Sequence, residues 1–217
     1  MDTIDPVIHY AEMFYQNLRD DENCQDRSWE HCYKVFHDAR QDYDYDYLSL
    51  HLVFYLASWG MYRRSSFLTH KYYRIHIPVV MELLDARYDC PFGLEYKDLK
   101  RSEIQQELAR LTTFMEQYYE GVSNSCKGTV KSRISDTLIT KILIGTLGCV
   151  PAYDRYCTEG FRSQKVSSGT SKRFHQVHMV LVPCFVWQTF TKRITGSWKK
   201  REITSKLMMC IIHRWRS

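Results

Sequence analysis

The fold is decided by the stretch Ser135–Tyr156, which reads SDTLITKILIGTLGCVPAYDRY. Ser135 and Asp136 are good helix N-caps, because a short side-chain oxygen can accept the unpaired N–H groups of a first turn. The residues that follow are apolar on most of a helical surface, which is typical of a core helix. Gly145 and Gly148 loosen the end of this helix, and Pro151 stops it. The stretch therefore predicts a buried helix over Asp136–Leu147.

A charged aromatic cluster follows this helix directly. Asp154 lies between Tyr153 and Arg155, and Tyr156 comes next. The buried helix would thus place one carboxylate, that of Asp154, just beyond its C-terminal end. That carboxylate has two interpretations, a catalytic acid in a cleft or a cap of the next helix that pairs with a neighbouring cation.

Two short segments of this stretch carry a resemblance. Thr140-Lys141-Ile142-Leu143 followed by Pro151-Ala152-Tyr153-Asp154-Arg155 resembles a segment of the 8-oxoguanine-glycosylase-like members of the helix-hairpin-helix DNA glycosylase superfamily. The Leu-Pro-Gly-x-Gly hairpin of that superfamily is missing upstream. More of the chain, including Leu48–Leu68, resembles an uncharacterised family of bacterial all-α proteins.

The glycosylase resemblance implies a DNA-acting protein that cleaves or recognises a base. Asp154 would then stabilise developing oxocarbenium charge or help to activate a nucleophile. A lysine amine could attack the sugar carbon, with Lys141 as the motif-aligned candidate and Lys131 as the second. The residues expected to hold a flipped base or its strand are Trp59, Tyr153, Arg155 and Tyr156. The alternative from a different class is a non-catalytic helical interaction protein, in which Asp154 is a cap and the aromatic residues form the core.

The composition of the chain favours helices over a turn-rich β fold. The 217 residues are 44% hydrophobic but include only five prolines and nine glycines, which is few for a turn-rich β fold. Apolar periodicity predicts helices over residues 4–19 and over Tyr45–Trp59. It predicts two more helices that begin at a Ser28 cap and at Pro78. A further helix starts at a capping box of Ser102 and Gln105 and ends at Gly121.

These patterns predict a mainly α-helical fold. Six or seven helices would form a compact domain over residues 1–159, packed around the apolar helices Tyr45–Trp59 and Asp136–Leu147. The segment Met61–Tyr73 places Arg63, Ser65 and other polar residues between aromatic ones. It predicts either a loop that contacts phosphate or a solvated turn.

The charge changes sign along the chain. Residues 160–217 contain 12 Lys or Arg and one acid, Glu202, whereas residues 1–159 carry 18 basic and 24 acidic groups. The second segment is irregular as well as basic, and we expect it to be a separate C-terminal extension. It is either a nucleic-acid-binding arm or an out-of-frame ending that replaces a helical terminus.

The remaining signals argue against several classes of protein. The eight cysteines form no C-x-x-C pair, which favours reduced, buried thiols over a zinc site. Asp42, Asp44 and Asp46 lack the later Gly and Glu of a calcium loop. The longest uncharged apolar run, Tyr47–Tyr62, is 16 residues long, shorter than a membrane span requires. We therefore expect a cytoplasmic protein without metal, cofactor or membrane contact, and with DNA as its possible partner.

Overall fold

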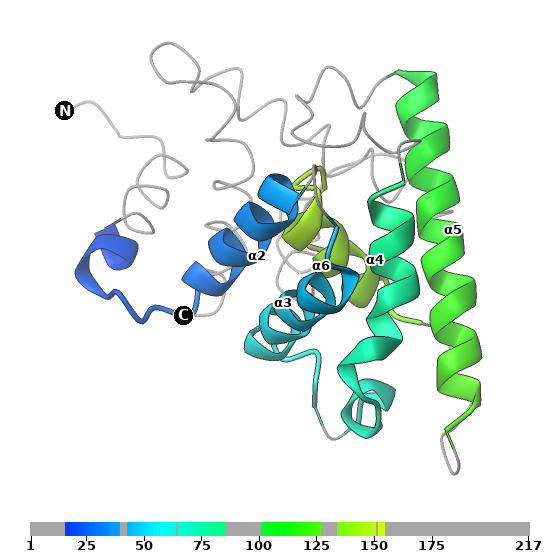
Figure 1. Ribbon diagram of the computed structural model, residues 1–217, viewed down its shortest axis with the longest axis horizontal. Helices are drawn as coiled ribbons and strands as arrows, with labels where there is room; N and C mark the ends of the chain where they lie inside the picture. Colours follow the sequence, from blue (N-terminus) through cyan, green and yellow to red (C-terminus); the bar gives the residue numbers. More distant parts are fainter. Residues whose placement is uncertain are drawn as a thin grey trace, which may run out of the picture.

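The computed structural model describes residues 16–39, 43–63, 65–85, 101–126, 134–150 and 152–154 (Figure 1). Within these ranges the chain forms helices and turns but no strand, which confirms the mainly α-helical prediction. The helices are α2 (Arg27–Asp38), α3 (Tyr45–Ser58), α4 (Ile77–Leu83), α5 (Ser102–Asn124) and α6 (Asp136–Thr146), with short 3-10 helices η2 (Phe67–His70) and η3 (Tyr73–His76). Residues 16–20 are also helical. The basic extension, residues 160–217, and residues 4–15 of the first predicted helix lie outside the described residues.

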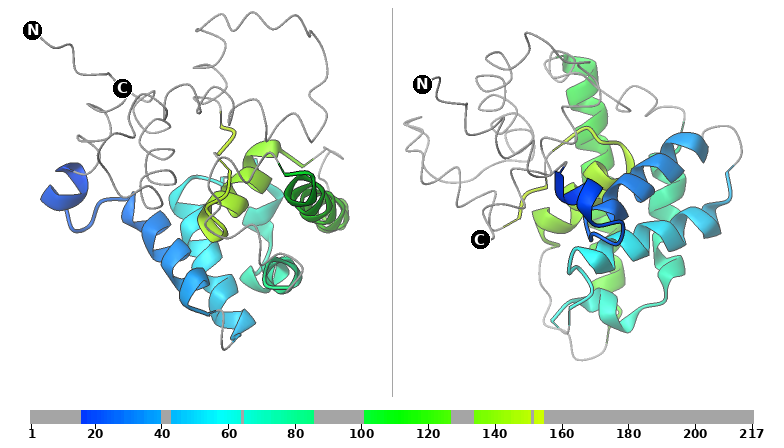
Figure 2. Two further views of the ribbon diagram at one scale, coloured as in Figure 1. Left: turned by 90° about the horizontal axis from the view of Figure 1, so that it is seen from above. Right: turned by 90° about the vertical axis from the view of Figure 1, so that its left-hand side faces the viewer.

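Helix α6 occupies the centre of the fold. Every residue from Leu138 to Thr146 is buried. α2 and α3 pack against α6 on one side, and α5 lies on the other (Figures 1 and 2). α4 fills the space between α3 and α5. The prediction that this apolar stretch forms a core helix is therefore confirmed.

Side chains cap the starts of α3 and α6, and the Ser135 cap of α6 follows the sequence signal. The Ser135 hydroxyl accepts the Leu138 N–H at the start of α6, at 3.3 Å. The Asp44 carboxylate accepts the Tyr47 N–H at the start of α3, at 3.0 Å. Asp46 instead pairs with Arg74 of η3 at 2.7 Å, so it joins α3 to the next segment of the chain.

Helix α3 differs from its prediction, because only one side of it is buried. Leu48, Leu52 and Leu56 are buried in the core. α2, α4 and α6 pack against α3. The opposite face remains uncovered, and Phe54 at its middle is 58% exposed. The sequence could not predict which side of α3 is exposed, because an apolar residue on the outer face contributes to the apolar pattern in the same way as a core residue.

Two predicted caps are wrong. α2 begins at Arg27 with Asp26 as its N-cap, and Ser28 lies inside the helix. The Ser28 hydroxyl accepts the indole N–H of Trp59 at 3.1 Å, so a tertiary contact takes the oxygen that a cap would use. Ser102 is the first helical residue of α5, whose N-cap, Arg101, makes no capping bond through its side chain.

Gly121 does not end α5, which continues to Asn124. The last turn is held because Tyr119 and Ser123 are both buried, and the packing of that face outweighs the helix-ending preference of glycine. A Cβ atom at Gly121 would meet no other atom within 4 Å.

The two glycines of the α6 stretch have different roles. Gly145 lies inside the helix against Tyr55, and a Cβ atom there would approach the ring of Tyr55 to 2.4 Å. Gly148 has a φ of +66° and donates its N–H to the Leu143 carbonyl at 3.0 Å, which closes the helix. Gly145 therefore permits close packing of α3 on α6, and only Gly148 acts at the end of the helix.

The cysteines and the helix lengths add two observations on the described residues. Cys24, Cys32, Cys126 and Cys149 are free thiols, of which Cys32 and Cys149 are buried. Burial raises the pKa of the Cys32 thiol well above its usual range. No helix in the described ranges combines the length and the apolar character needed to cross a bilayer.

Replacing each of two glycines by alanine tests the packing of α6. Gly145→Ala should lower the free energy of unfolding by about 1–3 kcal/mol, because the new methyl group overlaps the buried Tyr55 ring. Gly121→Ala is the matched control and should raise it by about 0.5–1 kcal/mol, because alanine is the better helix former in open space. Urea titration measures both, and equal effects of the same sign would contradict the packing described for α6.

Candidate functional site

Lys141, the predicted nucleophile, is 4% exposed in the middle of α6. Its ammonium donates a hydrogen bond to the Trp59 carbonyl oxygen at 2.8 Å and lies 5.7 Å from the centre of the Trp59 ring. Trp59 is the C-cap residue of α3, where backbone carbonyls lack partners within the helix and the helix dipole is negative. Lys141 therefore caps α3 from the neighbouring helix.

Trp59, a predicted base-stacking residue, is 5% exposed. Its indole N–H bonds to Ser28 of α2, and its carbonyl bonds to Lys141 of α6. Trp59 thus joins three helices, and stacking on a flipped base would require the ring to be uncovered first.

The segment that carries Asp154 runs back along α6. The Tyr153 N–H donates to the Thr140 hydroxyl at 2.8 Å, and the Thr137 hydroxyl donates to the Tyr153 carbonyl at 2.6 Å. We expected the helix to deliver Asp154 beyond its far end. The left-handed turn at Gly148 reverses the chain instead, so residues 152–154 lie beside the first half of α6.

Asp154 is partly buried and close to the core. Burial is the main cause of the raised pKa of Tyr55, and electrostatic interaction with Cys32 and Asp154 raises it further. The structure therefore gathers Lys141, Trp59 and Tyr153 around α6, with Asp154 near Tyr55. Lys131, Arg155 and Tyr156, the other predicted site residues, lie outside the described residues.

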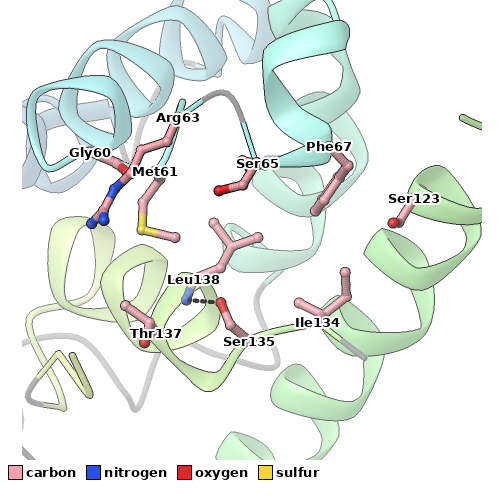
Figure 3. Close-up of a pocket in the computed structure, with 11 residues that line it drawn as sticks. Gly60, Met61, Arg63, Ser65, Phe67, Ser123, Ile134, Ser135, Thr137 and Leu138 are labelled. Atoms are coloured by element: carbon pink, nitrogen blue, oxygen red, sulfur yellow. Dashed lines mark hydrogen bonds between the residues drawn. The ribbon is translucent and has the colours of Figure 1, made fainter. Parts of the chain in front are cut away.

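A separate open cavity of about 340 Å³ lies where the loop after α3 meets α5 and the start of α6 (Figure 3). Its wall is formed by Gly60, Met61, Arg63, Ser65, Ser66, Phe67, Ser123, Ile134, Ser135, Thr137 and Leu138. None of the predicted site residues that the structure describes contributes to this wall. Arg63 and Ser65 belong to the loop for which the sequence predicts either phosphate contact or a solvated turn.

The groups in this wall suit binding better than catalysis. Ser66 and Ser135 already accept backbone N–H groups at helix starts, so their hydroxyl protons are left to donate. Arg63 is bent back and donates through Nε to the Gly60 carbonyl at 2.6 Å (Figure 3). Among the described residues of this wall, no histidine, carboxylate or lysine could act as a general base toward the serines.

A buried histidine behind this cavity was missed by sequence analysis. His76 Nε2 lies 2.7 Å from the Tyr62 hydroxyl, and His76 Nδ1 lies 2.5 Å from the Tyr119 hydroxyl. The neutral ring satisfies both contacts, because one nitrogen donates and the other accepts. Burial lowers the pKa of His76 to about 3. No motif marks this cluster, because its members come from three separate segments of the chain.

His76 predicts a specific dependence of stability on pH. The pKa of His76 is about 3 in the folded chain and about 6.5 in the unfolded chain. Between pH 3 and 6.5, therefore, the unfolded chain binds a proton at this residue and the folded chain does not. Lowering the pH from 8 to 5 should therefore cost about 2 kcal/mol through this residue. Urea titrations of the unmodified protein and of His76→Gln should show this difference in pH slope. An identical slope in both proteins would contradict the buried, neutral histidine.

Comparison with known proteins yields no family, curated sequence or solved structure that matches the chain. Within the described ranges, no group of three or more His, Cys, Asp or Glu side chains is placed to hold a metal ion.

Proposed function

We propose that this chain is a non-catalytic helical interaction protein that associates with a second copy of itself through the outer face of α3. The observation that carries the proposal is a stripe of exposed, uncharged residues on a helix whose other face is core. This outer stripe consists of Tyr47, Leu50, Phe54 and Ala57. Its large members are about half exposed, at 51% for Tyr47, 49% for Leu50 and 58% for Phe54.

The spacing of the outer stripe suits a second helix. Its residues follow one another at intervals of three, four and three positions, which is the a/d spacing of a helix-pairing seam. The stripe runs from Tyr47 to Ala57, ten steps along the helix or about 15 Å. Side chains at this spacing can interlock with an equivalent row on another helix.

The identity of the partner follows from charge and symmetry. A two-fold dimer places the same patch on both sides of the interface, so any charge in that patch would face its own copy. The outer stripe contains no Asp, Glu, Lys, Arg or His, and the flanking Val53 and Ser58 are uncharged. The two other flanking residues are engaged within the chain, Asp46 with Arg74 and His51 with His31. Two copies of the stripe can therefore face each other without bringing charges of the stripe into contact.

The size of the stripe sets the expected strength. A stable interface buries about 800 Å² on each partner, and four side chains on one helix supply only part of that area. We therefore expect weak, concentration-dependent association. The structural roles of Lys141, Trp59 and Tyr153 agree with a non-catalytic protein, because each residue fastens one element to another.

Phe54→Glu tests this proposal. A carboxylate at the centre of the seam would have to be buried without a partner, so the dimer should weaken by more than about tenfold. The matched control is Met81→Glu on α4, because Met81 is also 50% exposed but lies on a different helix. Sedimentation equilibrium over a range of concentrations should show association of the unmodified chain and of Met81→Glu. A monomer at all concentrations, or equal association of the three proteins, would exclude the proposal.

A second candidate, the DNA-acting glycosylase, has one specific observation in its favour. Thr137 and Thr140 fix the segment that carries Asp154 alongside the helix that carries Lys141. In this proposal Asp154 stabilises the positive charge that develops on the sugar as a base leaves.

An excision assay on DNA duplexes that carry damaged bases tests the second candidate. The unmodified chain should release a base, Asp154→Asn should not, and the control Asp136→Asn, at a carboxylate in the first turn of α6, should retain activity. Equal release by the unmodified chain and Asp154→Asn, or none by either, removes the catalytic role of Asp154.

A further inference from the structure

Two histidines from neighbouring helices face each other at the surface. His31 belongs to α2 and His51 to α3, and His31 Nε2 lies 3.1 Å from His51 Nδ1. Their ring centres are 4.8 Å apart, and the rings are tilted by 59°. The rings thus meet through their nitrogens instead of stacking face to face.

We propose that His31 and His51 form a binding site for a divalent transition-metal ion of the zinc class. Zinc binds imidazole nitrogens at 2.0–2.1 Å, so two ligands at a tetrahedral angle lie about 3.4 Å apart. The separation of 3.1 Å needs only a small rotation of the rings to admit the ion. Each imidazole would carry its proton on the outer nitrogen, His31 Nδ1 or His51 Nε2, and direct its lone pair at the metal.

The surroundings fix the two rings. α2 and α3 pack directly against each other, and ligands on packed helices keep their spacing better than ligands on loops. The Tyr47 ring contacts His51 edge-on, with ring centres 4.2 Å apart. Lys34, one turn after His31, forms a salt bridge with Asp38, which partly neutralises the nearest lysine on α2.

The ligand set determines the chemical class of the ion. Imidazole nitrogens suit zinc, copper, nickel and cobalt, whereas magnesium and calcium prefer oxygen. No third histidine, cysteine or carboxylate of the described residues completes the site. It is therefore an open site, where water or an external ligand takes the remaining positions, and we expect weaker binding than in a closed four-ligand site.

Zinc ions alone serve as the probe, added to the full chain at neutral pH. Calorimetry should show binding to the unmodified chain and to the control His37→Gln, which alters another exposed histidine of α2. His31→Gln and His51→Gln should each weaken binding by at least about tenfold. Nitrogen-correlated NMR should show zinc shifting His31 Nε2 and His51 Nδ1, and magnesium should shift neither.

Circular dichroism serves to check that each variant is folded. A calorimetric zinc titration of Phe54→Glu separates zinc binding from self-association. If His31→Gln and His51→Gln bind zinc as tightly as the unmodified chain, or if no protein binds it, the two rings share only a hydrogen bond. The metal site is then excluded, whatever the outcome for the dimer.

Discussion

A helix that is buried on all sides must find partners inside the protein for every polar group that it carries. α6 has this constraint, because it holds Thr140, Lys141 and Thr146 within a buried run of nine residues. Each of the three donates a hydrogen bond to a backbone carbonyl. The most demanding group is the Lys141 ammonium, since a buried charge without a partner is costly. The Trp59 carbonyl at the end of α3 accepts its hydrogen bond, so this contact ties the end of α3 to α6.

The other neighbours of α6 are positioned by contacts of the same kind. The Trp29 indole of α2 donates to the Ile144 carbonyl at 3.0 Å, and Gly145 lets the Tyr55 ring of α3 approach the helix. These contacts turn one face of α2 and one face of α3 inward. The opposite face of α3 carries the outer stripe, and the paired rings of His31 and His51 lie at the surface where α2 meets α3.

Sequence patterns predicted the helices well, because caps and apolar spacing are local properties. Ser135 and Pro78 each mark a helix start that the structure contains. Patterns failed where a distant residue decides the outcome. The sequence predicts Ser28 as a cap, but its hydroxyl accepts the indole N–H of Trp59. The sequence predicts that Gly145 loosens the helix, but Tyr55 packs against it.

The candidate site shows the same division. The sequence places Lys141 and Asp154 in one stretch, but it could not show that Gly148 turns the chain back or that Lys141 donates to the Trp59 carbonyl at the end of α3. The spacing of Tyr47, Leu50 and Phe54 was visible in the sequence. Its exposure was not, because only the placement of α2, α4 and α6 shows which side of α3 is left uncovered. The His31–His51 pair was equally hidden, since twenty positions separate the two residues.

The most direct test of the role of α6 is the free energy of unfolding of Lys141→Met, measured by urea titration. Methionine fills a similar volume but cannot donate to the Trp59 carbonyl, which would lose that donor at the end of α3. We predict a loss of about 1–3 kcal/mol relative to the unmodified chain. A variant as stable as the unmodified chain, or more stable, would contradict the claim that this buried contact organises the fold.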